Sequence, residues 1–318
     1  MITVLDNSAR PDSSPSPPPM GSLAKFYLLV FLLLLTVGFT SQMIHLKSGL
    51  AVTQLLVILL PALWYRRAHG IAGLPLGGSG ALPGRVVPAV LGLAASIWIL
   101  NLMLVGWMFR IFMRWGYEPV EVLPSPQTGG EYLLFLLLIA LLPGICEEIL
   151  FRGTIMPALQ EHGPLAAVVF SSFLFALFHV SFTNLVSAFL LGLVMGLLVV
   201  KTGSLWSAII YHITNNFLAV TALYLAEAAN LGEISDSAPE MWALPLLLVP
   251  LAAAAAVLSY RYIARHSAPP VLPNSARTLL PRGWLNWATV LVVVLYLGLV
   301  SMEIMVGFDF IQIDSGGM

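Results

Sequence analysis

Long apolar runs without Asp, Glu, Lys or Arg divide the chain and limit what it can fold into. They cover residues 26–46, 48–65, 86–109, 132–146, 164–200, 202–226, 241–260 and 283–302. Most are about 20 residues long, the length that a helix needs to cross the hydrocarbon core of a bilayer. With 9% charged and 59% apolar residues, a water-soluble globular domain is excluded. The sequence therefore predicts an integral membrane protein.

The spans are expected to be helices. Backbone groups inside a membrane must satisfy their own hydrogen bonds, and the unbroken runs lack the alternation of a β-barrel. The run 164–200 is too long for one helix and is interrupted by HVSFTN, so we divide it near residues 181–184. The predicted fold is all-α and polytopic, with eight or nine transmembrane helices.

Four parts of the chain can be distinguished by composition. Residues 1–24 are rich in proline and serine and are predicted to be a disordered tail. Residues 25–129 hold N-terminal spans, residues 130–226 form a core of four consecutive helices, and residues 227–318 hold C-terminal spans and an acidic tail. The first span starts late and is long, so we expect an uncleaved helix and not a signal peptide.

Loop charges predict the orientation. Basic residues gather between spans two and three and between spans eight and nine: Arg66, Arg67, Arg85, Arg261, Arg265, Arg277 and Arg282. Cytoplasmic loops are enriched in Lys and Arg, so we expect both loops and the N-terminus in the cytoplasm and the acidic C-terminus outside. Arg110 and Arg114, on the predicted outer side, run against this pattern. The net charge of −1 does not suggest a nucleic-acid partner, and we expect the plasma membrane of a prokaryote.

Glu147, Glu148 and Arg152 are charged residues well inside the predicted spans. An ionised group at membrane depth costs about 2.5 kcal/mol or more, so such residues usually pair and usually serve function. Glu148 and Arg152 are four residues apart on one helix face and can form an ion pair, whereas Glu147 lies about 100° around the helix. Pro143 and Gly144 interrupt the helix one turn earlier, and such breaks at membrane depth are tolerated where they line a cavity.

Polar residues in the next spans lie at matching depth. His179 follows Phe175 by four residues in FALFH, and Asn216 follows His212 by four in HITNN. Counted at 1.5 Å per residue from the predicted turns, Glu148 and His179 lie about 21 and 26 Å deep. His212 and Asn216 lie about 15 and 21 Å deep. A single membrane histidine or asparagine is more often a packing residue, but the whole set indicates one functional site.

Hydrolysis fits these residue types. A carboxylate in a partly dehydrated pocket can take a proton from water, and Glu147 is the candidate base because Arg152 can hold Glu148 ionised. The Asn216 amide and a histidine can stabilise negative charge on an attacked carbonyl. Neither a nucleophile elbow nor an HExxH motif occurs.

A metal-dependent alternative uses the same residues. Glu147, His179 and His212 form a candidate metal set, because a carboxylate and two imidazoles hold zinc in known catalytic sites. The sequence leaves both mechanisms open, one with a divalent metal such as zinc and one without a cofactor.

Three motifs resemble those of the CPBP intramembrane proteases, which include type II CAAX prenyl endopeptidases and bacteriocin-immunity relatives. EEILFR is similar to the EExxxR motif, FALFH to FxxxH and HITNN to HxxxN, in that order within about residues 130–220. The resemblance implies one site formed by Glu147, Glu148, Arg152, His179, His212 and Asn216. Glu147 would activate water with the help of His179, His212 and Asn216 would stabilise the oxyanion, and Glu148 with Arg152 would support the site.

The expected partners are membrane lipid and a protein or peptide substrate. Substrate choice is not implied by the resemblance, because the flanking spans lie outside the motif region, and in a bacterium a prenylated substrate is not expected. A non-catalytic membrane scaffold or immunity factor is the main alternative. A proton-coupled transporter is a third, since intramembrane acids and histidines also serve as relays, but no internal repeat supports it.

Overall fold

The structure is a computed structural model that describes residues 18–71, 81–118, 124–159, 162–229, 243–267 and 283–310. Within these ranges, all regular secondary structure is helical. Eight helical segments are long and apolar enough to cross a membrane, and a shorter apolar helix, Pro164–Phe178, accompanies them. The prediction of an all-α polytopic membrane protein with eight or nine helices is confirmed.

Three of the first four passes are built from several segments in line. The first contains α1 (Met20–Leu33), a π-helical segment (Leu34–Gly38) and α2 (Phe39–Ile44). The second contains α3 (Leu46–Val52), a π-helical segment (Thr53–Leu59) and α4 (Leu60–Ala68). The third is α5 (Val87–Arg114), entered through a 3-10 turn (Gly84–Val86). The fourth contains α6 (Gly129–Phe135), a π-helical segment (Leu136–Leu141), α7 (Leu142–Leu150), a second π-helical segment (Phe151–Ile155) and α8 (Met156–Ala158).

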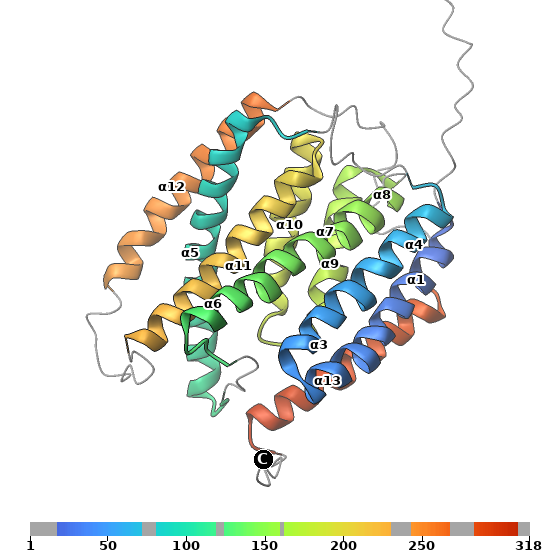
Figure 1. Cartoon of the computed structure of the whole chain (residues 1–318), viewed down its shortest axis with the longest axis horizontal. Helices are drawn as coiled ribbons and strands as arrows, with labels where there is room; N and C mark the ends of the chain where they lie inside the picture. The colour runs from blue at the N-terminus through green and yellow to red at the C-terminus, as the bar shows by residue number, and fades with distance from the viewer. Residues whose placement is uncertain are drawn as a thin grey trace, which may run out of the picture.

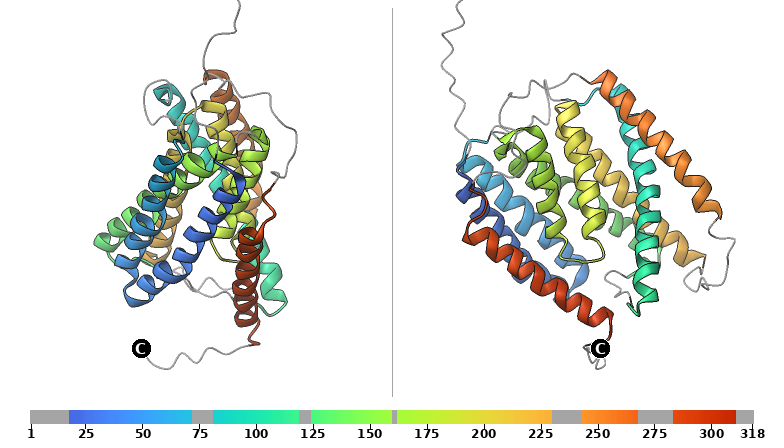
Figure 2. Two further views of the ribbon diagram at one scale, coloured as in Figure 1. Left: turned by 90° about the vertical axis from the view of Figure 1, so that its right-hand side faces the viewer. Right: turned by 180° about the vertical axis from the view of Figure 1, so that it is seen from behind.

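The later passes are single helices. They are α9 (Pro164–Phe178), α10 (Leu185–Thr202), α11 (Leu205–Ala228), α12 (Ala243–His266) and α13 (Trp287–Gly307). α9 packs on α10, α11 packs on both α5 and α7, and α12 lies along α5 (Figure 1). α13 runs beside α1 on the opposite flank (Figure 2). The passes alternate in direction, so successive connections lie at opposite ends of the bundle.

Most residues of α9 are buried, and small residues let α10 approach it. A Cβ atom on Gly192 would come within 3.0 Å of the Ser172 side chain, and one on Gly196 within 2.9 Å of Val168. Small residues are the usual means by which membrane helices pack closely. The break predicted near residues 181–184 lies between α9 and α10, as expected.

The predicted boundary of the N-terminal tail is wrong by a few residues. Of the predicted tail, residues 20–24 belong to α1, and residues 1–17 lie outside the described ranges. Leu23 and Ala24 are fully buried, and Ser22 is hydrogen-bonded to the Tyr65 hydroxyl and to His69, each at 3.2 Å. The helix therefore starts earlier than the apolar run, because α4 supplies partners for its polar first turn.

Candidate active site

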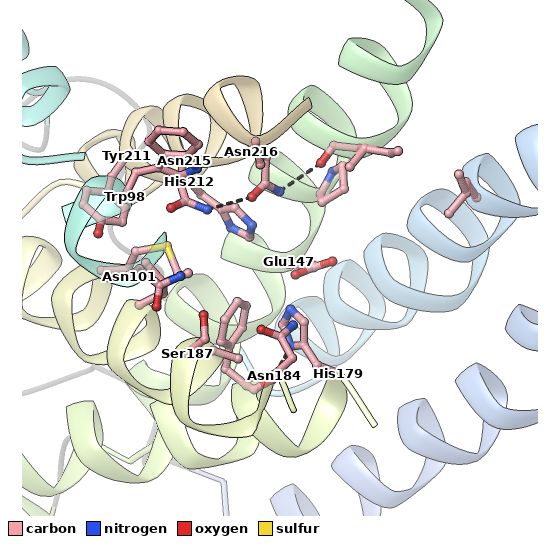
Figure 3. A pocket seen from close by; sticks show the side chains of 18 residues that line it. Trp98, Asn101, Glu147, His179, Asn184, Ser187, Tyr211, His212, Asn215 and Asn216 are labelled. Atoms are coloured by element: carbon pink, nitrogen blue, oxygen red, sulfur yellow. Dashed lines mark hydrogen bonds between the residues drawn. The ribbon is translucent and has the colours of Figure 1, made fainter. Parts of the chain in front are cut away.

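A cavity of about 400 Å³ lies among α3, α5, α7, α9, α10 and α11. Four of the six predicted site residues line it: Glu147, His179, His212 and Asn216. Figure 3 shows their side chains gathered around the cavity, with His212 and Asn216 both on α11. Glu148 and Arg152, the other two, lie behind its wall with no exposed surface. The structure thus brings the three motifs together at one place, as their matching depths indicate.

Glu147 faces the cavity and has one partner from a distant pass. Gln54, in the π-helical segment of the second pass, donates a hydrogen bond from Nε2 to Glu147 Oε1 at 2.9 Å. Glu147 retains 8% of its exposure, whereas its neighbour Glu148 retains none. The two adjacent glutamates therefore have different access to water in the cavity.

Glu148 is the centre of a buried charged group. Its Oε1 accepts hydrogen bonds from Arg152 Nη1 and from His212 Nδ1, both at 2.9 Å. The predicted Glu148–Arg152 ion pair is therefore present, and His212 joins it as a third member. Arg152 also donates from Nη2 to the Gly192 carbonyl at 2.8 Å. Such charges are stable away from water only when they are paired and hydrogen-bonded, and this group supplies both conditions.

Phe175 links the second motif to this charged group. The guanidinium carbon of Arg152 lies 4.6 Å from the centroid of the Phe175 ring, in the range of a cation–π interaction. The same ring meets His179 and His212 edge-on, with centroids 4.7 and 5.8 Å apart. Phe175 therefore packs between both histidines and the arginine, a role that spacing alone does not reveal.

His179 is oriented by its own helix. Its Nδ1 lies 2.8 Å from the Phe175 carbonyl oxygen, which can only accept, so Nδ1 carries a proton. In the neutral ring, Nε2 then has a free lone pair and acts as an acceptor. The Glu147 carboxylate and the His179 ring both point into the cavity (Figure 3).

Asn216 is tied to the break in the fourth pass. Pro143 has no N–H to donate to the carbonyl four residues earlier, that of Ile139. Asn216 donates from Nδ2 to this carbonyl at 2.9 Å, and its Oδ1 accepts from Asn215 Nδ2 at 3.0 Å. The second hydrogen on Asn216 Nδ2 remains for a ligand in the cavity. The predicted break at Pro143 thus lines the cavity and also fixes a motif residue.

The close approach of α7 and α11 explains Gly144. A Cβ atom there would lie 2.4 Å from Ile213 Cγ1 and 3.1 Å from the Ile213 backbone nitrogen. Any side chain would push α11 away, and α11 carries His212 and Asn216. The glycine next to Pro143 is therefore a requirement of helix packing.

The candidate metal set is not assembled among the described residues. No three His, Cys, Asp or Glu side chains in these ranges are placed to hold a metal ion. His212 turns its Nδ1 to Glu148, and Glu147 is bound by Gln54. The assignment of these three residues as metal ligands therefore stays a prediction.

Several polar residues of the site were not predicted. Gln54 is a lone amide in an apolar run, and that isolation was the signal available for it. The cavity lining also includes polar or aromatic residues that follow no motif: Trp98, Asn101, Asn184, Ser187, Tyr211 and Asn215. Trp98 and Asn101 come from α5, and their position depends on how α5 packs against α11, which sequence spacing does not give.

The comparison with known families agrees with this geometry. Residues 129–218 match the family model described as type II CAAX prenyl endopeptidase Rce1-like. The match runs from the start of α6 into α11, so it contains all three motifs, which lie in the fourth pass, α9 and α11. A search of curated proteins and a search of solved structures found no match. This segment is therefore similar to the CPBP/CAAX protease family, and the match supports an assignment to that family.

Proposed function

We propose that the protein is an intramembrane endopeptidase in which Glu147 activates the attacking water. The observation that carries this proposal is the different placement of two adjacent glutamates. Glu147 lines the cavity with His179, whereas Glu148 is sealed behind the wall by Arg152 and His212. A general base must reach the water that it deprotonates, and of the two only Glu147 can.

A water molecule held between Glu147 and His179 would have both hydrogens engaged. The carboxylate accepts one hydrogen and the unprotonated Nε2 of His179 accepts the other, which leaves an oxygen lone pair for the peptide carbonyl. Glu147 takes the proton as the oxygen–carbon bond forms. It then returns the proton to the leaving nitrogen as the carbon–nitrogen bond breaks, so the products are a carboxylic acid and an amine.

His212 and Asn216 are the proposed donors to the oxyanion. Glu148 accepts from His212 Nδ1, and when both ring nitrogens of His212 carry protons, Nε2 is the donor to the oxyanion. As Glu147 is neutralised, the negative charge moves to the oxyanion beside His212 and the second Asn216 N–H.

The experiment compares membrane peptides in cells that produce the wild type or Glu147→Gln. We expect peptides that accumulate with the wild type to be missing with the variant, at equal protein levels. A variant that retains full biological function without any cleavage would favour the scaffold or immunity role over the enzyme.

A further inference from the structure

A second cavity lies on the outer side of the bundle and does not belong to the candidate active site. It is a groove of about 400 Å³ between α5, α10 and α12, and it shares no lining residue with the first cavity. Leu197 and Val257 in its wall are 40% and 49% exposed, so the groove is open to the surface. Apart from Tyr260 and Arg261, the lining is aliphatic: Leu93, Ile97, Val194, Leu197, Ala256 and Val257.

The groove exists because α12 packs on α5 more closely than on α10. α12 lies mainly along α5, where a Cβ atom on Gly92 would come within 3.2 Å of the Ser259 Oγ atom. The contact between α12 and α10 is much smaller, and the groove lies between these two helices. The outer surface of a membrane-spanning bundle faces acyl chains and not water. An aliphatic groove on this surface therefore suits a hydrocarbon chain.

The groove is close to one end of the bundle. α5 begins and α10 and α12 finish at this end (Figures 1 and 2). Arg85, just before α5, donates from Nη2 to the His266 carbonyl at the end of α12 at 3.4 Å. At 1.5 Å per residue, Leu93 lies about 9 Å from the start of α5, and Leu197 lies about 8 Å from the end of α10. Half of the hydrocarbon core is about 15 Å thick, so a lipid of one leaflet can reach the groove.

Positive charge at this end has no acidic partner in the described part of the chain. Arg261 lines the groove, and three more basic residues lie at the ends of the same helices: Arg85, Lys201 and Arg265. α5, α10 and α12 contain no Asp or Glu, and none of the four basic residues forms an ion pair with a described residue. An aliphatic groove thus lies beside basic side chains whose charge is not balanced by the protein.

We propose that the groove binds one anionic phospholipid of the surrounding bilayer. One acyl chain lies against the aliphatic lining, and the phosphate accepts hydrogen bonds from Arg261. Guanidinium groups bind phosphate with paired N–H donors, and the long stem of arginine lets its charged head reach the membrane surface. The other three basic residues add attraction for a headgroup with net negative charge. This site is separate from the candidate active site, so the proposal does not depend on protease activity.

Native mass spectrometry of the full chain in detergent tests the proposal. Phosphatidylglycerol and phosphatidylcholine with the same acyl chains are titrated, and the Kd of the first bound lipid is measured. We expect the wild type to bind phosphatidylglycerol at least about fivefold more tightly, and Arg261→Gln to weaken its binding about fivefold, the effect of one basic residue near an anionic surface. Leu197→Trp narrows the groove and leaves the charge, so it should weaken both lipids to the same extent.

Two matched controls should keep wild-type binding of both lipids. Arg114→Gln removes an exposed basic residue at the opposite end of α5. Leu190→Trp changes a residue of α10 that is 41% exposed, against 40% for Leu197, and lies outside the groove. Thermal unfolding without lipid shows that each variant is folded, and Val257→Trp, on α12, takes the place of Leu197→Trp if that variant unfolds.

Three results would overturn the proposal. The first is equal affinity of the wild type for the two lipids, and the second is wild-type affinity in both Arg261→Gln and the folded tryptophan variant of the groove. The third is an equal loss in Arg114→Gln and Arg261→Gln, which would reduce the effect to general charge. A dimer in the same spectra that Leu197→Trp dissociates would assign the groove to a second copy of the chain and would also refute lipid binding.

Discussion

Glu147 and Glu148 are adjacent, but we expect their substitutions to have different effects because the two side chains have different surroundings. Glu147 has a neutral amide partner and a cavity, so Glu147→Gln can keep a hydrogen bond to Gln54 and remain folded. An amide cannot accept the proton of water at neutral pH, so we expect cleavage to fall by at least about 100-fold. Glu148→Gln and Arg152→Ala each strand buried charge and should lose about 3–5 kcal/mol of stability. Thermal unfolding in detergent and peptide cleavage are measured side by side.

The stability and cleavage of these three variants together show which glutamate is the base and which supports the fold. Normal cleavage by Glu147→Gln would mean that Glu147 is not the base. If Glu147→Gln unfolds while Glu148→Gln is stable and inactive, the two glutamates have exchanged roles.

Gln54 is predicted to position the base. Gln54→Met keeps the length of the side chain but removes the donor to Glu147 Oε1. Hydrogen bonds to charged groups contribute about 1.5–3 kcal/mol, so we expect kcat to fall roughly ten- to hundredfold with little change in KM. Gln42→Met is the matched control, because Gln42 of the first pass donates to Thr53, the neighbour of Gln54, and does not line the cavity. Equal kcat for both variants would show that Gln54 does not position Glu147.

At the residue scale, the depth of the polar side chains in the membrane could be predicted from the sequence, but the contacts that they make between helices could not. The pair Glu148–Arg152 could be predicted because both members share one helix face. Helical spacing could not show that His212 turns to Glu148, since this contact joins residues 64 apart and depends on how α7 and α11 rotate against each other.

At the scale of elements, Pro143 and Asn216 are predicted to be energetically coupled. Asn216→Ala leaves the Ile139 carbonyl without its side-chain donor, at a cost of about 1–3 kcal/mol. Pro143→Ala restores an N–H that can donate to this carbonyl, so Asn216→Ala should cost less in that background. A double-mutant cycle of unfolding free energies should give a coupling of about 1 kcal/mol. Additive effects would show that the break and the asparagine are independent.

The connection between α9 and α10 is held by the last helix. Glu303 of α13 accepts from the Phe182 N–H at 2.6 Å and from the hydroxyls of Ser181 and Thr183 at 3.1 and 3.3 Å. Val180, next to His179, has φ of 45°, a left-handed conformation that costs a β-branched residue about 1–3 kcal/mol. Such a conformation persists where neighbours fix it, and these hydrogen bonds do so.

We therefore expect Glu303→Ala to reduce kcat more than KM, because His179 loses its fixed position while the rest of the cavity remains. A loss of roughly tenfold corresponds to about 1.4 kcal/mol. Glu303→Gln, which keeps one acceptor oxygen, should recover part of the rate. Glu227→Ala removes an exposed acid from the same end of the bundle and serves as the control. A Glu303→Ala enzyme with wild-type kcat would contradict this role.

The membrane-spanning passes could be predicted from the sequence, whereas the π-helical segments within them could not. Apolar run lengths gave the nine passes and the break before α10, because a bilayer fixes the length of a span. The π-helical segments on both sides of α7 were not predicted. Wider helical turns of this kind are frequent at functional sites, and here they depend on packing against α11 and α4 and on no local sequence signal.

At the scale of the whole molecule, the family segment is not a self-sufficient unit. Residues 129–218 contain the three motifs, but Gln54 comes from the second pass, and Trp98 and Asn101 come from α5. Tyr27 of α1 donates to the Leu174 carbonyl at 2.7 Å, and Arg66 of α4 donates to the Gly153 carbonyl. The flanking helices thus complete the cavity wall and satisfy backbone groups of the core.

The final prediction follows from these contacts and compares two divisions of the chain. Residues 124–229 alone should yield no cleavage and little extractable monomer, because buried groups such as the Leu174 carbonyl lose partners at about 1–3 kcal/mol each. Residues 1–118 and 119–318, produced together, should associate and cleave, since the cut falls between α5 and α6 and keeps every contact named here. Size-exclusion chromatography in detergent and the peptide assay measure both. Wild-type cleavage by residues 124–229 alone would show that the core positions Glu147 without Gln54, and that the surrounding passes serve only to anchor it in lipid.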